Sequence, residues 1–129
     1  MIHKEIGQYQ ILEKIGHGGM GVVYKAIHKK IEKIVAIKAL SPQLSEDPKM
    51  RERFINEAKL QAKLSHPNIV NIINYIESED NVYLIMEYVD GETLESKLKR
   101  EGAIRYEEAV EISVDILEAL NYLHSKGIV

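Results

Sequence analysis

The stretch that decides the fold is residues 15–24, Ile-Gly-His-Gly-Gly-Met-Gly-Val-Val-Tyr. It holds half of the protein's eight glycines, and a β-branched run follows them at once. Glycine has no Cβ, so its backbone can adopt positive φ and its N–H groups can approach a bulky anion closely. The pattern G-x-G-x-x-G-x-V is filled by Gly16, Gly18, Gly21 and Val23. Taken alone, this pattern fits a phosphate-binding loop and a glycine-rich hairpin equally well.

Composition limits the classes of function that the chain can have. With 129 residues, 45% of them hydrophobic, the chain can bury the core of one modest domain. Its 17 basic and 20 acidic residues give a net charge of -3, so no basic excess points to nucleic acid or a membrane surface. The absence of cysteine excludes disulfides, thiolate catalysis and cysteine zinc sites. With no apolar run of membrane-spanning length and no signal-peptide core, we expect a cytoplasmic segment.

Five short β-strands are predicted from runs that are β-branched or that alternate between apolar and polar residues. They are expected over residues 9–15, 22–28, 33–40, 69–76 and 82–88. Tight polar turns join the first three, which favours an antiparallel meander. The acidic segment 77–81 is expected to be an exposed turn between the last two.

Three helices are predicted from apolar residues that recur at helical spacing. They are expected over residues 50–64, 92–100 and 106–124. Asp47 offers an N-cap to the first helix and Pro48 a first helical residue, so this helix should begin there. Glu57 follows Phe54 by three residues and is expected on the apolar face of the helix.

Two common phosphate-binding loops fit this sequence poorly. In a dinucleotide-binding loop the glycines open a helix, whereas here Val22 and Val23 continue as a strand. Where a ribose-binding acid is expected, the sequence has the strand Val35-Ala36-Ile37-Lys38 instead. The P-loop requires Gly-Lys-Ser or Gly-Lys-Thr after the glycines, and neither occurs.

The glycine loop followed by a lysine-bearing strand resembles the N-terminal lobe of the eukaryotic-like protein kinases. The segments His-Pro-Asn-Ile-Val at 66–70 and Met-Glu-Tyr-Val at 86–89 extend the resemblance through essentially the whole chain. The sequences of residues 18–21 and 90–94 resemble those of bacterial Ser/Thr kinases more than those of tyrosine kinases.

This resemblance implies an α+β fold in three parts. Residues 1–88 would form the ATP-binding N-lobe, a five-stranded antiparallel sheet with one helix, and residues 89–91 the hinge. Residues 92–129 would form two helices from the start of the C-lobe.

The resemblance also implies a nucleotide site. In the family, the glycine loop covers the ATP phosphates, and a lysine of the third strand pairs with the phosphates and with a helix glutamate. Lys38 and Glu57, 19 residues further on, match these two positions, and we expect them to form an ion pair. Met86 would be the gatekeeper, and adenine would bond to the Glu87 carbonyl and the Val89 amide. The implied nucleotide-binding residues are Ile15, Gly16, His17, Gly18, Gly19, Met20, Gly21, Val23, Ala36, Lys38, Met86, Glu87, Val89 and Leu94.

ATP, Mg²⁺ and a protein hydroxyl are the implied ligand, metal and phosphoryl acceptor. Family members continue after residues 126–129 into a His-Arg-Asp loop and an Asp-Phe-Gly motif, which supply the catalytic aspartate and the metal ligands. This sequence contains neither motif. We therefore expect a fragment that binds no metal and is inactive by itself. A nucleotide-binding or regulatory module without catalysis is the alternative.

The helix over residues 106–123 carries a wide apolar face that nothing else in the sequence covers. An uncovered face of this kind drives association. A homodimer or a swapped oligomer through this helix is therefore expected.

Overall fold

A computed structural model describes residues 4–18 and 21–129. The chain divides into two compact units. The first contains Met1–Lys63 and Asn71–Val89, and the second contains Leu64–Val70 and Asp90–Val129. In the part of the chain that is described, no helix combines the length and the apolar character needed to cross a membrane.

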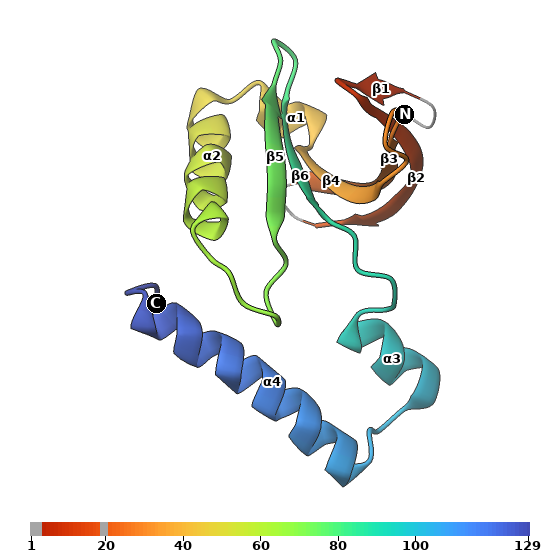
Figure 1. The fold of residues 1–129 in the computed structure, drawn as a ribbon, viewed down its shortest axis with the longest axis vertical. Coiled ribbons are helices and arrows are strands. Elements are labelled where there is room, and N and C mark those ends of the chain that lie inside the picture. The colour runs from red at the N-terminus through yellow and green to blue at the C-terminus, as the bar shows by residue number, and fades with distance from the viewer. Residues whose placement is uncertain (1–3, 19–20) are drawn as a thin grey trace. The chain divides into compact units, whose positions relative to one another are not determined.

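The first unit is built on a six-stranded antiparallel sheet (Figure 1). In sheet order its strands are β1 (Glu5–Ile6), β2 (Tyr9–His17), β3 (Gly21–His28), β4 (Ile34–Leu40), β6 (Val82–Glu87) and β5 (Ile72–Glu77). The five expected strands are all present. The sixth, β1, has two residues, too few for alternation to reveal. β5 begins at Ile72 rather than at residue 69, because Ile69 N–H donates to the His66 carbonyl in a turn.

The two faces of the sheet carry different cores. One face is covered by a cluster made of Ile6, Tyr9, Ile11, Tyr24, Ala26, Val35, Ile37, Ala39, Tyr83 and Ile85. On the other face, Leu40, Val82 and Leu84 pack against Phe54 and Ala58 of α2 (Pro48–Ala62). Successive residues of a strand point to opposite faces, so Lys38 lies on the side that α2 covers.

Helix α2 begins where the sequence predicts. The Asp47 carboxylate accepts a hydrogen bond from Lys49 N–H at 2.9 Å, and Pro48 is the first helical residue. Only Phe54 and Ala58 of this helix are buried. The expectation that Glu57 lies on the apolar face was wrong, because the buried stripe runs through Phe54 and Ala58 and leaves the Glu57 side chain 52% exposed. A one-turn helix, α1 (Pro42–Ser45), precedes α2 and was not expected.

The second unit contains α3 (Leu94–Glu101) and α4 (Tyr106–Ser125). The Thr93 hydroxyl caps α3 by accepting from Ser96 N–H at 3.0 Å. The segment that precedes β5 in the sequence packs against α4: Ser65 N–H donates to the Tyr122 hydroxyl at 2.9 Å, and the Asn68 amide donates to the Asp115 carbonyl at 2.9 Å. No residue of α4 is buried.

Candidate functional site

Four of the predicted nucleotide-binding residues lie together on one face of the sheet. In the antiparallel ladders, Val23 of β3 is opposite Lys38 of β4, and Ala36 of β4 is opposite Met86 of β6. Directly opposite residues share a face, as do residues two apart in one strand. Val23, Ala36, Lys38 and Met86 therefore form one surface, on the side of the sheet away from the larger core.

The glycine loop joins β2 to β3 at the edge of this surface. Gly16 is opposite Val23, and Gly18 N–H donates to the Gly21 carbonyl at 2.9 Å, which closes the loop. A bulge between Lys14 and Gly16 makes Ile15 the extra residue of β2, with 42% of its surface exposed. His17 ends β2 and is exposed. Gly19 and Met20, also predicted to bind nucleotide, lie outside the described residues.

The described loop glycines are needed for space rather than for an unusual φ. None of Gly16, Gly18 and Gly21 has a positive φ, contrary to the freedom that the sequence suggested. Among the described residues, a Cβ on Gly16 or Gly18 would meet nothing within 4 Å, so the backbone there is open to a bulky group. A Cβ on Gly21 would lie 2.1 Å from the Ala39 carbonyl oxygen of β4. Gly21 thus allows β3 to approach β4 closely.

Lys38 and Glu57 do not form an ion pair in the described part of the chain. Lys38 Nζ lies 5.9 Å from the centroid of the Phe54 ring, so its ammonium group faces α2. The Glu57 carboxylate lies 3.5 Å from Arg53 Nε, one helical turn earlier, and both of these side chains are more than half exposed. Glu57 faces solvent because Phe54 and Ala58 occupy the inner side of α2.

The predicted hinge begins at a well-anchored strand end. Glu87 N–H donates to the Asn71 carbonyl at 3.0 Å, and the Glu87 carboxylate accepts from Asn71 N–H at 2.8 Å. These bonds fix the end of β6, while the following Val89 is 64% exposed. Leu94, the last predicted contact, is the first residue of α3 in the second unit and is 42% exposed.

Sequence reasoning missed two residues beside this surface. Lys25 is opposite Ala36, and its Nζ lies 5.0 Å from the centroid of the Tyr88 ring, within cation–π range. The spacing of two residues from Val23 could have placed Lys25 on this face.

Among the described residues, no group of three or more His, Asp or Glu side chains is placed to hold a metal ion. A cavity of about 880 Å³ lies between α1, α2 and the β5–β6 turn, and none of the predicted nucleotide-binding residues lines it.

Known proteins resemble this chain along most of its length. The family model described as "Protein kinase domain" matches residues 9–129. A probable serine/threonine-protein kinase of Clostridium perfringens is 39% identical over 130 residues, which cover 100% of this chain and 19% of that protein. The serine/threonine-protein kinase PknA of Mycobacterium tuberculosis is 38% identical over 128 residues, which cover 95% of this chain and 30% of that protein.

Solved structures show the same arrangement of elements. The crystal structure of the Mycobacterium tuberculosis PknI kinase domain superposes with a TM-score of 0.81 at 27% identity, covering 98% of this chain. The match covers 52% of that kinase domain. The chain thus spans about half of a solved kinase domain and less than a third of the curated relatives above.

Proposed function

The chain belongs to the protein kinase domain family, and from this membership we propose that it is the ATP-binding part of a serine/threonine-protein kinase. The whole protein would transfer a phosphoryl group from ATP to hydroxyl groups of a protein substrate, in the cytoplasm where ATP is available. The observation that carries the proposal is the shared face of Val23, Ala36, Lys38 and Met86 beside loop glycines that are open to a bulky anion.

The residues divide by the part of ATP that they would bind. Backbone N–H groups of the glycine loop and the Lys38 ammonium group neutralise and orient the phosphates. The apolar side chains of Val23, Ala36 and Met86 cover adenine, whose polar edge bonds to the backbone at Glu87 and Val89. The remaining members of the proposed set are Ile15, Gly16, His17, Gly18, Gly19, Met20, Gly21 and Leu94.

We further propose that Glu57 exchanges Arg53 for Lys38 when nucleotide binds. Breaking the Arg53–Glu57 pair would cost little free energy, because an exposed ion pair at this helical spacing contributes only about 0.3–0.5 kcal/mol. Lys38 already faces α2. Pairing with Glu57 would then hold the flexible lysine stem against the phosphates.

ATP titration tests the proposal. Isothermal titration of the wild-type chain should show binding, and Lys38→Met should weaken it by about tenfold to a hundredfold, since hydrogen bonds to charged groups contribute about 1.5–3 kcal/mol. Lys33→Met is the matched control, because Lys33 is exposed in the turn before the same strand. Equal affinity of the wild type and Lys38→Met, or no binding by the wild type, would overturn the proposal.

The chain by itself is proposed to bind ATP without transferring phosphate. It contains neither the His-Arg-Asp nor the Asp-Phe-Gly motif, which in the family supply the catalytic aspartate and the Mg²⁺ ligands. Incubation with radiolabelled ATP and a generic protein substrate should leave the substrate unlabelled. Labelling that disappears in Lys38→Met would refute this. A module that binds nucleotide without catalysis is the alternative, and a whole protein lacking both motifs would favour it.

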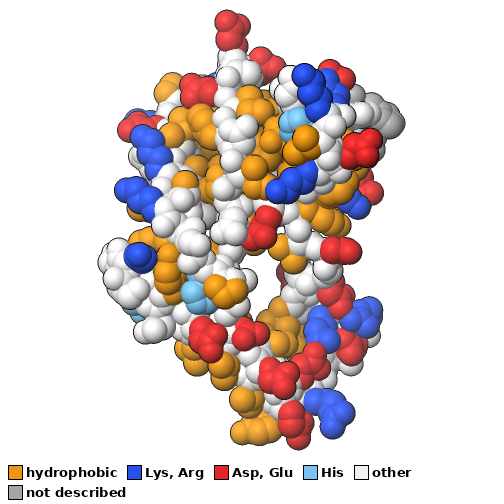
Figure 2. Space-filling view, viewed as in Figure 1, with side chains coloured by type: hydrophobic (Ala, Val, Ile, Leu, Met, Phe, Trp, Pro, Cys, Tyr) orange, Lys and Arg blue, Asp and Glu red, His pale blue; other side chains and the backbone are white. Residues whose placement is uncertain are grey.

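We also propose that a second copy of the chain covers α4. Hydrophobic side chains lie at the surface along this helix (Figure 2), and the exposed ones include Val110, Val114, Ile116, Leu117 and Leu120. A contiguous apolar face of this kind favours association. Light scattering should give the mass of a dimer or larger oligomer, and Leu117→Glu should return it to the monomer. A monomeric wild type at high concentration would contradict the proposal.

A further inference from the structure

The position of α2 decides whether Glu57 can reach Lys38, and apolar packing fixes only the middle of this helix. Of its fifteen residues only Phe54 and Ala58 are buried. Both lie in the second and third turns. The first turn has no buried apolar residue, and its Met50 is only half-buried. A helix held at one stripe can pivot or slide unless polar contacts restrain its end.

Arg51 supplies such a contact in the first turn of α2. Its Nη2 donates to the Ser78 carbonyl at 3.0 Å, and its Nη1 donates to the Glu79 carbonyl at 3.2 Å and to the Ser45 carbonyl at 3.5 Å. The planar guanidinium group can bond to several carbonyls at once, which an ammonium group cannot do with the same geometry. One side chain thus joins α2 to α1 and to the turn between β5 and β6.

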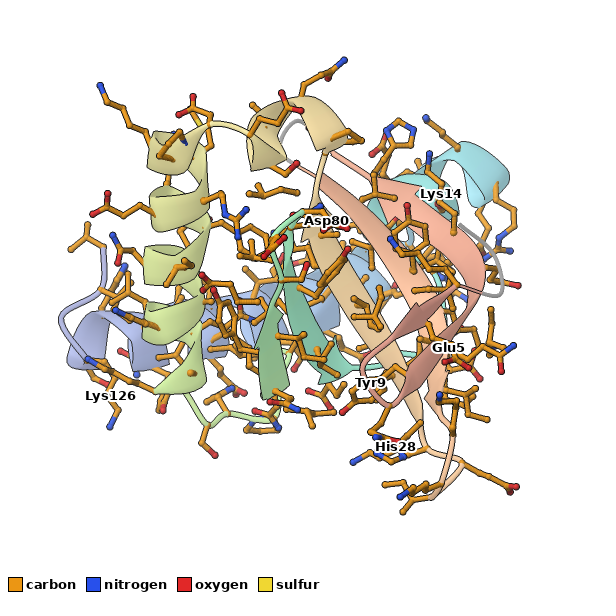
Figure 3. The ribbon with its side chains drawn as sticks, turned by 90° about the horizontal axis from the view of Figure 1, so that it is seen from above. Glu5, Tyr9, Lys14, His28, Asp80 and Lys126 are labelled. Atoms are coloured by element: carbon orange, nitrogen blue, oxygen red, sulfur yellow. The ribbon has the colours of Figure 1, made fainter. Side chains whose placement is uncertain are left out.

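The β5–β6 turn is itself tied to β4. Ser78 N–H donates to the Asn81 carbonyl at 2.9 Å, and the Ser78 hydroxyl donates to the same oxygen at 3.1 Å, which closes the turn. The buried Asn81 side chain donates to the Leu40 carbonyl at the end of β4 at 2.8 Å. Asp80 marks this turn in Figure 3, where it lies between α2 and β4.

A continuous polar connection therefore runs from the strand that carries Lys38 to the helix that carries Glu57. It passes from Leu40 through Asn81 and the turn to Arg51. We propose that Arg51 is a positioning residue, which sets where α2 stands relative to β4 and thereby where Glu57 stands relative to Lys38. The second half of this statement rests on the proposed nucleotide-binding function, and the first half does not.

The position of α2 can be measured without nucleotide. The chain has no cysteine, so spin labels can be attached to Asn56→Cys on α2 and Lys33→Cys before β4, both at exposed positions. In Arg51→Met, double electron–electron resonance should show a label-to-label distance distribution that is shifted or clearly broadened. Lys49→Met removes an exposed cation from the same helical turn and should leave the distribution unchanged. An unchanged distribution in Arg51→Met overturns the proposal.

A double-mutant cycle on ATP affinity tests the path through Glu57. Arg51→Met should weaken ATP binding by about fivefold in the wild-type background and by less than about twofold in Glu57→Gln, because residues that act through one another are not additive. A general loss of structure would weaken ATP binding equally in both backgrounds. Such a result would overturn the proposal that Arg51 acts through Glu57. If the wild type does not bind ATP, the proposed function fails, while the distance measurement still decides the role of Arg51. If Arg51→Met does not fold, Arg51→Lys should change the distance distribution and the ATP affinity in the same direction but by a smaller amount.

Discussion

At the scale of single residues, the loop glycines differ in what an added methyl group would meet. Gly21→Ala would put a Cβ 2.1 Å from the Ala39 carbonyl oxygen, and this neighbour is backbone that cannot rotate away. Strands β3 and β4 would have to separate, so we expect a loss of about 1–3 kcal/mol in the free energy of unfolding. Urea unfolding followed by circular dichroism measures it.

Gly18→Ala is the matched control for that substitution. Its Cβ would meet none of the described residues within 4 Å, and its φ is not positive, so the fold should lose little stability. The added methyl group should instead keep the backbone of the loop away from the ATP phosphates, which would lower the affinity for ATP. A stability loss in Gly18→Ala as large as that in Gly21→Ala would contradict the assignment of separate roles.

Tyr75 has an altered acidity that one hydrogen bond helps to cause. Burial, and then the hydrogen bond from its hydroxyl to the Glu77 carboxylate at 2.7 Å, raise the pKa of Tyr75 to about 12. Because the folded state holds this proton more tightly than the unfolded state, its contribution to stability is complete below pH 10 and is lost as the pH rises from about 10 to about 12.

Glu77→Gln should lower the pKa of Tyr75 toward its ordinary value, since the carboxylate charge that disfavours the phenolate is gone. Ultraviolet titration of the variant, with Tyr75→Phe subtracted as the reference, isolates this tyrosine from the others. Glu79→Gln is the control, because Glu79 is in the same acidic turn but is not among the groups that shift the pKa of Tyr75. An unchanged pKa in Glu77→Gln would exclude Glu77 as a cause.

At the scale of elements, the start of α2 is both predictable and testable. Asp47 caps this helix through its bond to Lys49 N–H. Asp47→Ala should cost about 1 kcal/mol of stability, as loss of an N-cap usually does. Amide hydrogen exchange in the first turn of α2 should accelerate, whereas Glu46→Ala at the neighbouring exposed position should leave it unchanged. Equal exchange in the two variants would show that the cap is dispensable.

Local patterns predicted the elements well where the signal lies within a few residues. The cap at Asp47, the proline after it and the β-branched runs along β3 and β4 are of this kind. The face that Glu57 occupies was not predictable, because it depends on which side of α2 the sheet buries. Spacing alone places Glu57 near Phe54. In the structure, however, the sheet buries the side of α2 that carries Phe54 and Ala58, and Glu57 lies outside it. The Arg51 bonds join residues 27 and 28 positions apart, so no local pattern reveals them.

At the scale of the whole molecule, the division of the chain does not follow the order of its elements. Residues 64–70 lie between α2 and β5 in the sequence but belong to the unit that contains α3 and α4. Side-chain chemistry explains this placement. The His66 ring lies 5.1 Å from the Tyr122 ring, centroid to centroid, and Ser65 and Asn68 each hydrogen-bond to α4.

Tyr122→Phe tests how much of this attachment one hydroxyl provides. The variant keeps the ring against His66 but removes the acceptor of the Ser65 N–H bond, so we expect about 0.5–1.5 kcal/mol less protection of this amide. Exchange of the Ser65 amide, followed by nuclear magnetic resonance, should accelerate accordingly. Tyr106→Phe is the control, because the Tyr106 side chain is on the same helix and is 79% exposed. If Ser65 exchanges equally fast in both variants, the ring contact and the Asn68 bond hold the segment without the Tyr122 hydroxyl.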